Sequence, residues 1–439
     1  MASVSDYPFF FTWTAQHAAK PLEITGGDRA HFTTADGGTW LDLGTLSYQV
    51  NAGHGRRPIV EAIKRQADEL CLSAPNAVYP AKTELARRLL AMAGRGFEQG
   101  KVFFTLGGAE ANENAIKMAR LVTNRLKLVS RYRSYHGASM GALTLTGDWR
   151  RPAVEPGVPG VVHVQDCYCD RCPFGQKVET CKRECATNIG ETMRLEGPQS
   201  VAAVFLEPVQ NSGGCFPPPP GYFDRVREIC DHYEVLLVSD ETICAFGRIG
   251  GMFACEDLKY QPDMITCAKG MTSGYSPIGA MIASDRLFEP FRTGTTYFPH
   301  GYTFGGHPVS AAVAMTNLDI FEREGLYQHV REQAPAFRAS LERLLDLPIV
   351  GDVRGEGFFY GIELVKDKAT RETFDDDESE RLLRGFLSKA LFDAGLYCRA
   401  DDRGDPVVQL APPVIIGQPE FDQIEQILRS VLTEAWSRI

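Results

Sequence analysis

The sequence lacks long apolar runs and an excess of positive charge. In its 439 residues, no stretch of about 18 residues is free of both charged side chains and helix breakers, as a membrane-spanning helix requires. The N-terminal segment Met1-Ala-Ser-Val-Ser-Asp-Tyr-Pro8 has no basic start followed by an apolar run, so we expect no signal peptide and a cytoplasmic location. The net charge of −10 argues against a nucleic-acid-binding protein, which would carry a basic surface.

Internal repeats and low-complexity segments are also absent. Hydrophobic residues make up 44% of the chain and charged residues 23%, a composition too hydrophobic for a disordered protein. The length supports a large buried core and fits either two or three domains or one large α/β domain with an appendage. The acidic run Asp375-Asp-Asp-Glu378 is interpreted as a helix N-terminus, because carboxylates stabilise the positive end of the helix dipole.

Cysteine is unevenly distributed, since five of the twelve cysteines lie between residues 167 and 185. Within this segment, Cys169 and Cys172 are followed after eight residues by Cys181 and Cys185, a spacing compatible with four thiolates around zinc. Disulfides are rare in the cytoplasm, so free or occasionally paired thiols are the favoured interpretation and structural zinc is the alternative. We expect no metal in the catalytic chemistry.

Short apolar runs alternate with amphipathic segments in the middle of the chain, which is the pattern of strands joined by helices in a parallel sheet. Strands are predicted at 101–105, 128–130, 201–206, 235–239, 264–267 and 278–283, and helices after residue 108 and around residues 223–229. From about residue 315 the pattern changes. It predicts one long helix from 315 to 344, strands at 358–365 and 407–410, and helices at 378–394 and 421–435.

These patterns predict an α/β protein with two domains and an N-terminal segment. We assign residues 61–315 to a large domain with a mostly parallel sheet, and we interpret residues 167–185 as a Cys-rich insertion in it. Residues 316–439 are predicted to form a smaller α+β domain, and residues 1–60 are expected to pack with it.

Two of the predicted strands end in ionisable residues. The strand 235–239 is followed by Asp240, and the strand that starts at Met264 is followed by Lys269; ligands of open α/β sheets bind outside such carboxyl ends. A buried lysine can form a Schiff base with an aldehyde cofactor, and an aspartate can keep a pyridine nitrogen protonated. Together they suit a pyridoxal phosphate site, although each alone has an ordinary alternative, a solvated loop lysine or a helix-capping aspartate.

The surroundings of these two residues match one enzyme family. They read Asp240-Glu-Thr-Ile-Cys-Ala-Phe-Gly-Arg-Ile-Gly250, Pro262-Asp-Met-Ile-Thr-Cys-Ala-Lys-Gly270 and Ile278-Gly-Ala280, and further matching segments stand in the family's order at 51–55, 105–112, 135–137, 207–208, 303–308, 353–355 and 411–413. From about residue 20 to 435 the chain resembles the class III (ω-) aminotransferases of fold type I. The resemblance implies bound pyridoxal 5′-phosphate (PLP) and a large domain built on a seven-stranded, mostly parallel sheet.

The resemblance also implies roles for the residues around the cofactor. Lys269 resembles the lysine that binds the cofactor aldehyde and carries a proton between the substrate carbon and the cofactor carbon. Asp240 is expected at the pyridine nitrogen and Tyr135 on one face of the ring. Thr242 is expected on the other face, where the family more often has valine. Glu207 is expected to support the site, with a strand-end cap as the alternative.

The phosphate of the cofactor is expected at the start of the helix after residue 107. The backbone amides of Gly108 and Ala109 open this helix and can hold an anion. The family usually reads Asn-Ser-Gly-Ser-Glu where this chain reads Leu106-Gly-Gly-Ala-Glu110, so hydroxyl donors are lost while the amides remain. In the family, the residue at the position of Thr303 contacts the phosphate from the neighbouring subunit, which implies a homodimer with active sites at the interface.

Substrate recognition is inferred from arginine positions. Ornithine-type relatives place an arginine two residues before Ala-Pro-Pro, and this chain has Gln409 there, which argues against ornithine-like specificity. Pyruvate-dependent ω-aminotransferases carry a mobile arginine shortly after an Ala-Gly-Leu segment, as Arg399 stands here. A guanidinium can bind a carboxylate with two hydrogen bonds, so Arg399 is the predicted carboxylate-binding residue and Arg403 the nearby alternative. Tyr48 and Trp13 are expected to border the substrate pocket, with ordinary packing as the alternative for Trp13.

Together these residues predict a PLP-dependent aminotransferase that moves an amino group from an ω-amine or ω-amino acid to a keto acid. Taurine, β-alanine, a diamine or an aromatic amine is the expected donor, pyruvate the expected acceptor and ping-pong the expected mechanism. The alternatives are a 2,1-aminomutase or a decarboxylating enzyme on the same fold. A further alternative is a zinc-binding scaffold without catalysis, against which the intact Lys269 and Asp240 argue.

Overall fold

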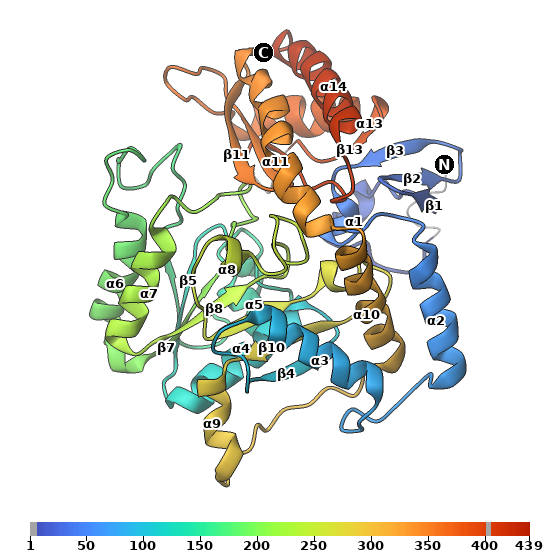
Figure 1. Ribbon diagram of the computed structural model, residues 1–439. Helices are drawn as coiled ribbons and strands as arrows, with labels where there is room; N and C mark the ends of the chain where they lie inside the picture. Colours follow the sequence, from blue (N-terminus) through green and yellow to red (C-terminus); the bar gives the residue numbers. More distant parts are fainter. Residues whose placement is uncertain (1–6, 401–404) are drawn as a thin grey trace.

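A computed structural model describes residues 7–400 and 405–439 (Figure 1). Its largest sheet has seven strands in the order β4-β10-β9-β8-β7-β5-β6. These strands are β4 (Lys101–Thr105), β5 (Lys127–Arg131), β6 (Val161–Val164), β7 (Val201–Leu206), β8 (Leu236–Asp240), β9 (Met264–Cys267) and β10 (Gly279–Ala283). Strand β10 runs antiparallel to β4 and β9, and the other neighbours are parallel. The predicted α/β architecture is confirmed.

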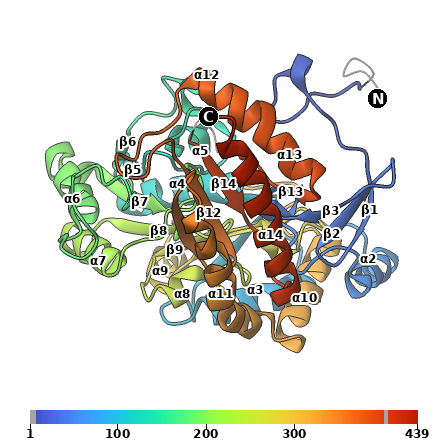
Figure 2. The ribbon, with the colours of Figure 1, turned by 90° about the horizontal axis from the view of Figure 1, so that it is seen from above.

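The central strands form because their sequences are continuous apolar runs. Every residue of β7, β8, β9 and β10 is buried, as in strands that are covered on both faces. Helix α4 (Gly108–Thr123) packs against β4, β9 and β10. Helices α6 (Glu184–Glu196) and α7 (Tyr222–Tyr233) lie side by side in both views (Figure 1, Figure 2). The other helices of this part are α3 (Pro80–Ala93), α5 (Met140–Leu145), α8 (Ala254–Asp257) and α9 (Asp285–Thr293).

The C-terminal part contains a three-stranded antiparallel sheet in the order β11 (Val350–Glu356), β12 (Phe359–Leu364), β14 (Val407–Leu410). Its helices are α11 (Leu326–Glu342), α12 (Asp376–Glu378), the π-helix η7 (Ser379–Leu387), α13 (Ser388–Asp393) and α14 (Gln418–Trp436). The predicted apolar face of α14 is buried from Phe421 to Ala435. In the part of the chain that the structure describes, none of the helices has both the length and the apolar character needed to cross a membrane.

The N-terminal segment forms a second sheet that includes a strand from the C-terminal part. Strands β1 (Ile24–Asp28), β2 (His31–Thr34) and β3 (Thr39–Asp42) are joined by β13 (Leu396–Tyr397), which runs parallel to β3. After β3 come α1 (Thr45–Tyr48) and α2 (Arg57–Glu69). The pairing brings the segment with Tyr48 close to the segment with Arg399. The domain boundaries at residues 60 and 315 stay a prediction.

The predicted single helix from 315 to 344 is wrong. The chain forms α10 (Pro308–Arg323) and α11, and they are separated at Gly325, whose φ of 63° lies in the left-handed region that favours glycine. Strand β11 was not predicted, because Gly351, Asp352 and Gly355 interrupt its apolar pattern. The interpretation of the acidic run is confirmed, since the side chain of Asp375 caps α12 and accepts a hydrogen bond from the backbone three residues on, at 2.8 Å.

Candidate active site

A cavity of about 930 Å³ lies at the carboxyl ends of β8 and β9, and its size is in the range of small-molecule sites. Ten of the eleven residues that the sequence predicts for the site line this cavity. They are Trp13, Tyr48, Gly108, Ala109, Tyr135, Glu207, Asp240, Thr242, Lys269 and Arg399. The eleventh, Thr303, is exposed and is not one of the lining residues.

Asp240, the last residue of β8, is held by three hydrogen-bonding contacts. Its Oδ2 accepts from Asn112 Nδ2 at 2.7 Å and lies 2.8 Å from His136 Nδ1, and its Oδ1 accepts from the Thr242 amide at 3.1 Å. Burial alone raises the pKa of a carboxyl group. These three partners outweigh burial and hold the pKa of Asp240 below its usual value. Asp240 is therefore ionised at neutral pH and can hold a proton on a pyridine nitrogen.

Further contacts fix the partners of Asp240. Asn112 Oδ1 accepts from Thr266 Oγ1 at 2.9 Å, and Asn112 Nδ2 also donates to the His136 carbonyl at 2.7 Å. The second ring nitrogen of His136 lies 3.0 Å from Ser130 Oγ. With both ring nitrogens engaged, His136 orients Asp240. Asn112 has no predicted role, although a polar residue on the buried face of a helix is a signal that could have revealed it.

Lys269 stands two residues after the end of β9 and is the first residue of the short 3-10 helix η5 (Lys269–Met271). Its φ of 41° is rare for a residue with a side chain and costs about 1–3 kcal/mol. The next turn holds this conformation, because Asn317 Nδ2 donates to the carbonyls of Gly270 at 2.9 Å and Met271 at 3.1 Å. The backbone thus fixes the direction in which the Lys269 side chain leaves the chain, and Lys269 lines the cavity.

The N-terminus of α4 offers an anion site beside the cavity. Gly107, Gly108 and Ala109 line the cavity here, and the first amides of a helix have no partners within the helix. A side chain at Gly107 would meet no atom within 4 Å, whereas one at Gly108 would come within 2.7 Å of Thr242. The Thr242 hydroxyl is buried and has no hydrogen-bond partner among the described residues. The open space, the amides and the unpaired hydroxyl fit the phosphate and ring of PLP.

Tyr135 and Glu207 form another wall of the cavity. Glu207 Oε1 accepts from the Tyr135 amide at 3.1 Å, and Oε2 accepts from the Asn211 amide at 3.1 Å. Burial raises the pKa of Glu207, and the charge of Asp240 adds to this effect. Trp13 meets the Tyr135 ring edge-on, with a centroid distance of 6.0 Å and an interplanar angle of 89°. These contacts suit Glu207 to position the backbone of Tyr135.

Arg399 and Tyr48 meet in a further part of the cavity. Arg399 Nη2 donates to the Tyr48 hydroxyl at 3.0 Å, and the Tyr48 hydroxyl donates to Gln409 Oε1. Gln409 Nε2 in turn donates to the carbonyl of Asn211 at 3.0 Å and to its Oδ1 at 2.8 Å. Gln409 stands where ornithine-type relatives have an arginine, and here it holds Tyr48 in place. Arg403, the alternative carboxylate-binding residue, lies outside the described residues.

The Cys-rich insertion lies outside this cavity. Among the described residues, none of the twelve cysteines forms a disulfide, and those at 167, 169, 172, 181 and 185 line a second, much smaller cavity. Within residues 7–400 and 405–439, no three His, Cys, Asp or Glu side chains are arranged to hold a metal ion. The zinc alternative stays a prediction. The insertion contacts the C-terminal sheet, because Tyr168 and Arg171 both bind Glu363 of β12.

The seven-stranded fold and the cavity with Asp240, Lys269 and the α4 N-terminus define a PLP-dependent enzyme. The family model for aminotransferase class-III matches residues 14–432, which is most of the chain. The protein belongs to the class III aminotransferases, and its cofactor is pyridoxal 5′-phosphate.

Individual relatives agree with this assignment. The probable aminotransferase Rv3329 of Mycobacterium tuberculosis is 58% identical over 419 residues, which cover 94% of this chain and 89% of the relative. The taurine–pyruvate aminotransferase of Bilophila wadsworthia is 33% identical, with 92% of this chain and 91% of the relative covered. The crystal structure of taurine:2-oxoglutarate aminotransferase from Bifidobacterium kashiwanohense, in complex with PLP and glutamate, has a TM-score of 0.91 and 34% identity and covers 99% of this chain and 97% of its own. These similarities confirm the fold, the enzyme class and the cofactor.

Proposed function

We propose that the protein transfers an amino group from an ω-amine or ω-amino acid to pyruvate by a ping-pong mechanism. The observation that carries this proposal is the contact between Arg399 and Tyr48 at the cavity that also contains Lys269 and Asp240. The Bilophila wadsworthia relative, named for taurine and pyruvate, supports both the donor class and the acceptor. The Bifidobacterium kashiwanohense relative, named for taurine and 2-oxoglutarate, makes 2-oxoglutarate the acceptor against which pyruvate must be compared.

Arg399 is suited to bind the carboxylate of the keto acid. A guanidinium can form two parallel hydrogen bonds to a carboxylate. One of its nitrogens donates to the neutral hydroxyl of Tyr48, and exchanging a neutral acceptor for a carboxylate strengthens the bond. The residue is exposed, so its side chain has room to turn away when the donor carries no carboxylate. Arg399 would thereby serve both half-reactions in one cavity.

Lys269 and Asp240 carry the proton chemistry of the proposal. PLP, when bound, supplies an aldehyde and an electron-withdrawing ring. Lys269 moves a proton at the amine-bearing carbon of the substrate, from a backbone position fixed by the turn after β9. Asp240, ionised because of its three partners, holds a proton on the ring nitrogen. The first half-reaction yields an aldehyde or ketone, and the second converts pyruvate to alanine.

The proposal includes a homodimer with active sites at the interface. Thr303 is exposed and lies outside the cavity of its own chain, and open space remains beside Gly107 at the phosphate end. Thr303 of the partner subunit would then complete the phosphate site, as the family resemblance implies. The cytoplasmic location inferred from the sequence also stays a prediction.

A spectral assay of the holoenzyme tests the proposed function. A donor should bleach the visible band of the bound cofactor when no keto acid is present, and pyruvate should restore the band and give alanine. The Lys269→Ala variant should do neither. Restoration by 2-oxoglutarate alone would contradict the acceptor assignment. Isomerisation of the donor without bleaching would instead indicate an aminomutase.

A further inference from the structure

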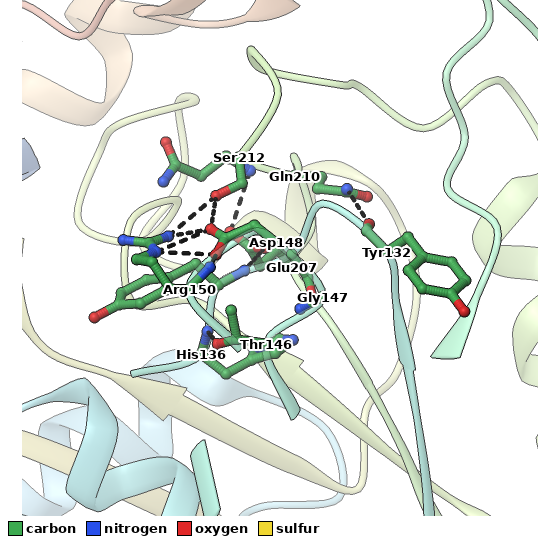
Figure 3. Close-up of polar contacts among 12 residues, drawn as sticks. Tyr132, His136, Thr146, Gly147, Asp148, Arg150, Glu207, Gln210 and Ser212 are labelled. Carbon is green, nitrogen blue, oxygen red and sulfur yellow. Dashed lines mark hydrogen bonds and ion pairs between the residues drawn. The ribbon is translucent and has the colours of Figure 1, made fainter. Parts of the chain in front are cut away.

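Arg150 lines the active-site cavity but has no place in the chemistry proposed above. Its side chain is only 2% exposed. Asp148 binds it from one side, because Arg150 Nε lies 3.0 Å from Oδ1 and 3.1 Å from Oδ2, and Nη2 also donates to Oδ2. Nη2 donates in addition to Ser212 Oγ at 3.3 Å, and this hydroxyl donates to Asp148 Oδ2 at 2.8 Å. Figure 3 shows the three side chains as one closed network.

The remaining guanidinium nitrogen, Nη1, makes no hydrogen bond with any described residue. In Figure 3 it points away from Asp148 and Ser212. It is not one of the fully buried polar atoms without a partner, and Arg150 lines the cavity, so Nη1 is accessible from the cavity. A guanidinium nitrogen is a strong donor that carries no acceptor lone pair. Its natural partner is therefore an oxygen of a molecule bound in the cavity.

Two aromatic rings pack against this guanidinium. Arg150 Cζ lies 3.6 Å from the centroid of the Tyr135 ring and 5.0 Å from that of Trp13, which are distances of cation–π contact. Arg150 is thus held at the aromatic wall of the cavity that also contains Lys269 and Asp240.

The cavity therefore contains two guanidinium groups that are held independently. Tyr48 positions Arg399, and Asp148 with Ser212 positions Arg150. Charge-assisted hydrogen bonds to carboxylate or sulfonate oxygens are stronger than bonds to neutral acceptors. Two such groups allow the acid of the keto acid and a remote acid of the donor to be bound by different residues.

We propose that Arg150 Nη1 binds the acidic group of the amino donor, a carboxylate or a sulfonate remote from the reacting amine. The preferred donors are then ω-amino acids, and neutral amines are poorer substrates. This inference rests on the proposed function and narrows its donor class. Arg150 acts as a specificity residue in it, while Lys269 and Asp240 keep their roles.

The test changes Arg150 and Asp148 together. Removing Arg150 alone would leave a buried aspartate without its partner, which is strongly destabilising, so the variant is Asp148→Asn/Arg150→Gln. The matched control is Arg151→Gln, because Arg151 is the next residue, pairs with Glu155 and does not line the cavity. The measured quantity is kcat/KM for β-alanine divided by kcat/KM for 1-phenylethylamine, with pyruvate as the acceptor.

The ratio should fall roughly tenfold in the double variant, the effect of one hydrogen bond to a charged group, and should stay constant in the control. An unchanged ratio in the double variant overturns the inference, even when both kcat/KM values fall together. The single variant Asp148→Asn should change the preference for β-alanine in the opposite direction. Removing the negative charge beside Arg150 should lower the KM for β-alanine relative to the KM for 1-phenylethylamine. No change in that relative KM also overturns it.

Binding of butyrate to the holoenzyme gives a readout that needs no turnover. Calorimetry is carried out in an Arg399→Ala background, so that Arg399 does not contribute. The Kd should rise roughly tenfold when Asp148→Asn/Arg150→Gln is added, and an equal Kd overturns the inference. If no donor reacts with the wild type, the proposed function fails. If 1-phenylethylamine reacts but the ratio of the kcat/KM values for β-alanine and 1-phenylethylamine is the same with and without Arg150, only this inference fails.

Discussion

Arg399 Nη2 and the Tyr48 hydroxyl lie 3.0 Å apart although 351 positions separate the two residues. The parallel pairing of β13 with β3 brings their segments together. From Tyr48 the hydrogen bonds continue through Gln409 and Asn211 to Glu207, which also binds the Tyr135 amide. The predicted keto-acid site and the predicted cofactor wall are thus one connected unit.

Tyr48→Phe tests whether this contact positions Arg399. We expect the KM for pyruvate to rise roughly fivefold, because a typical hydrogen bond contributes about 1 kcal/mol. The ring contact with Phe359, at a centroid distance of 6.0 Å, is retained in the variant. Steady-state kinetics with varied pyruvate provide the measurement, and an unchanged KM would show that Arg399 does not depend on Tyr48.

Asn112→Ala tests the network around Asp240. Asn112 donates to Asp240 and helps to lower the pKa of that carboxyl, so the acid limb of the kcat–pH profile should move to higher pH in the variant. Urea unfolding should show a loss of about 1–3 kcal/mol, because Thr266 and the His136 carbonyl lose a partner. Asn114→Ala is the matched control, since the amide of Asn114 is buried in the same helix and has no hydrogen-bond partner among the described residues. Equal shifts in both variants would refute this role of Asn112.

Thr242→Val addresses the buried hydroxyl in the cofactor site. Removing a polar group that lacks a partner should leave the apoprotein as stable as the wild type or more stable. If the hydroxyl binds the cofactor, the increase in Tm on adding PLP should be smaller in the variant, and the absorption maximum of the holoenzyme should shift. Differential scanning fluorimetry with and without PLP measures the first effect, and equal increases in Tm would contradict the assignment.

The buried carboxyl group of Glu241 should make the stability of the protein depend on pH. It is buried and accepts hydrogen bonds from the amides of Ala254 and Cys255 at 2.8 Å each. Burial raises the pKa of Glu241 from its usual 4.5 to about 7. Between pH 4.5 and about pH 7, Glu241 keeps its proton in the folded protein but has released it in the unfolded chain. The free energy of unfolding should therefore fall as the pH rises through this range. Urea unfolding of the wild type and Glu241→Gln at several pH values should give a shallower slope for the variant; parallel curves would refute the assignment.

Subunit hybrids test the proposed role of Thr303. Thr303→Ala and Lys269→Ala chains should each have low activity as homodimers. A mixed dimer should recover activity, because the site with an intact Lys269 receives Thr303 of the partner subunit. Mixing the two chains after mild unfolding and measuring kcat provides the result. Activity that only averages the two parents would show that Thr303 does not act across an interface.

The fold and much of the candidate site could be predicted because their signals are local. The apolar runs that form β8 and β9 end next to Asp240 and Lys269, and the carboxyl ends of neighbouring parallel strands meet at one edge of the sheet. Gly108 and Ala109 start a helix whose apolar face repeats with helical spacing. In each case the residue type and its immediate neighbours carry the information.

Other features depend on contacts between distant segments and could not be predicted. Arg150 binds Ser212 across 62 positions, and Gln409 binds Asn211 across 198, so no local pattern marks these residues. The break between α10 and α11 has a local signal in Gly325, but the apolar spacing on either side hides it.

Transfer of a nitrogen label tests the central proposal most directly. The holoenzyme is mixed with ¹⁵N-labelled β-alanine and unlabelled pyruvate, and the products are analysed by mass spectrometry. We predict ¹⁵N-alanine in an amount equal to the donor consumed, and none with Lys269→Ala. Consumption of the donor without ¹⁵N in alanine, or no consumption at all by the wild type, would contradict the assignment of an ω-amino acid:pyruvate aminotransferase.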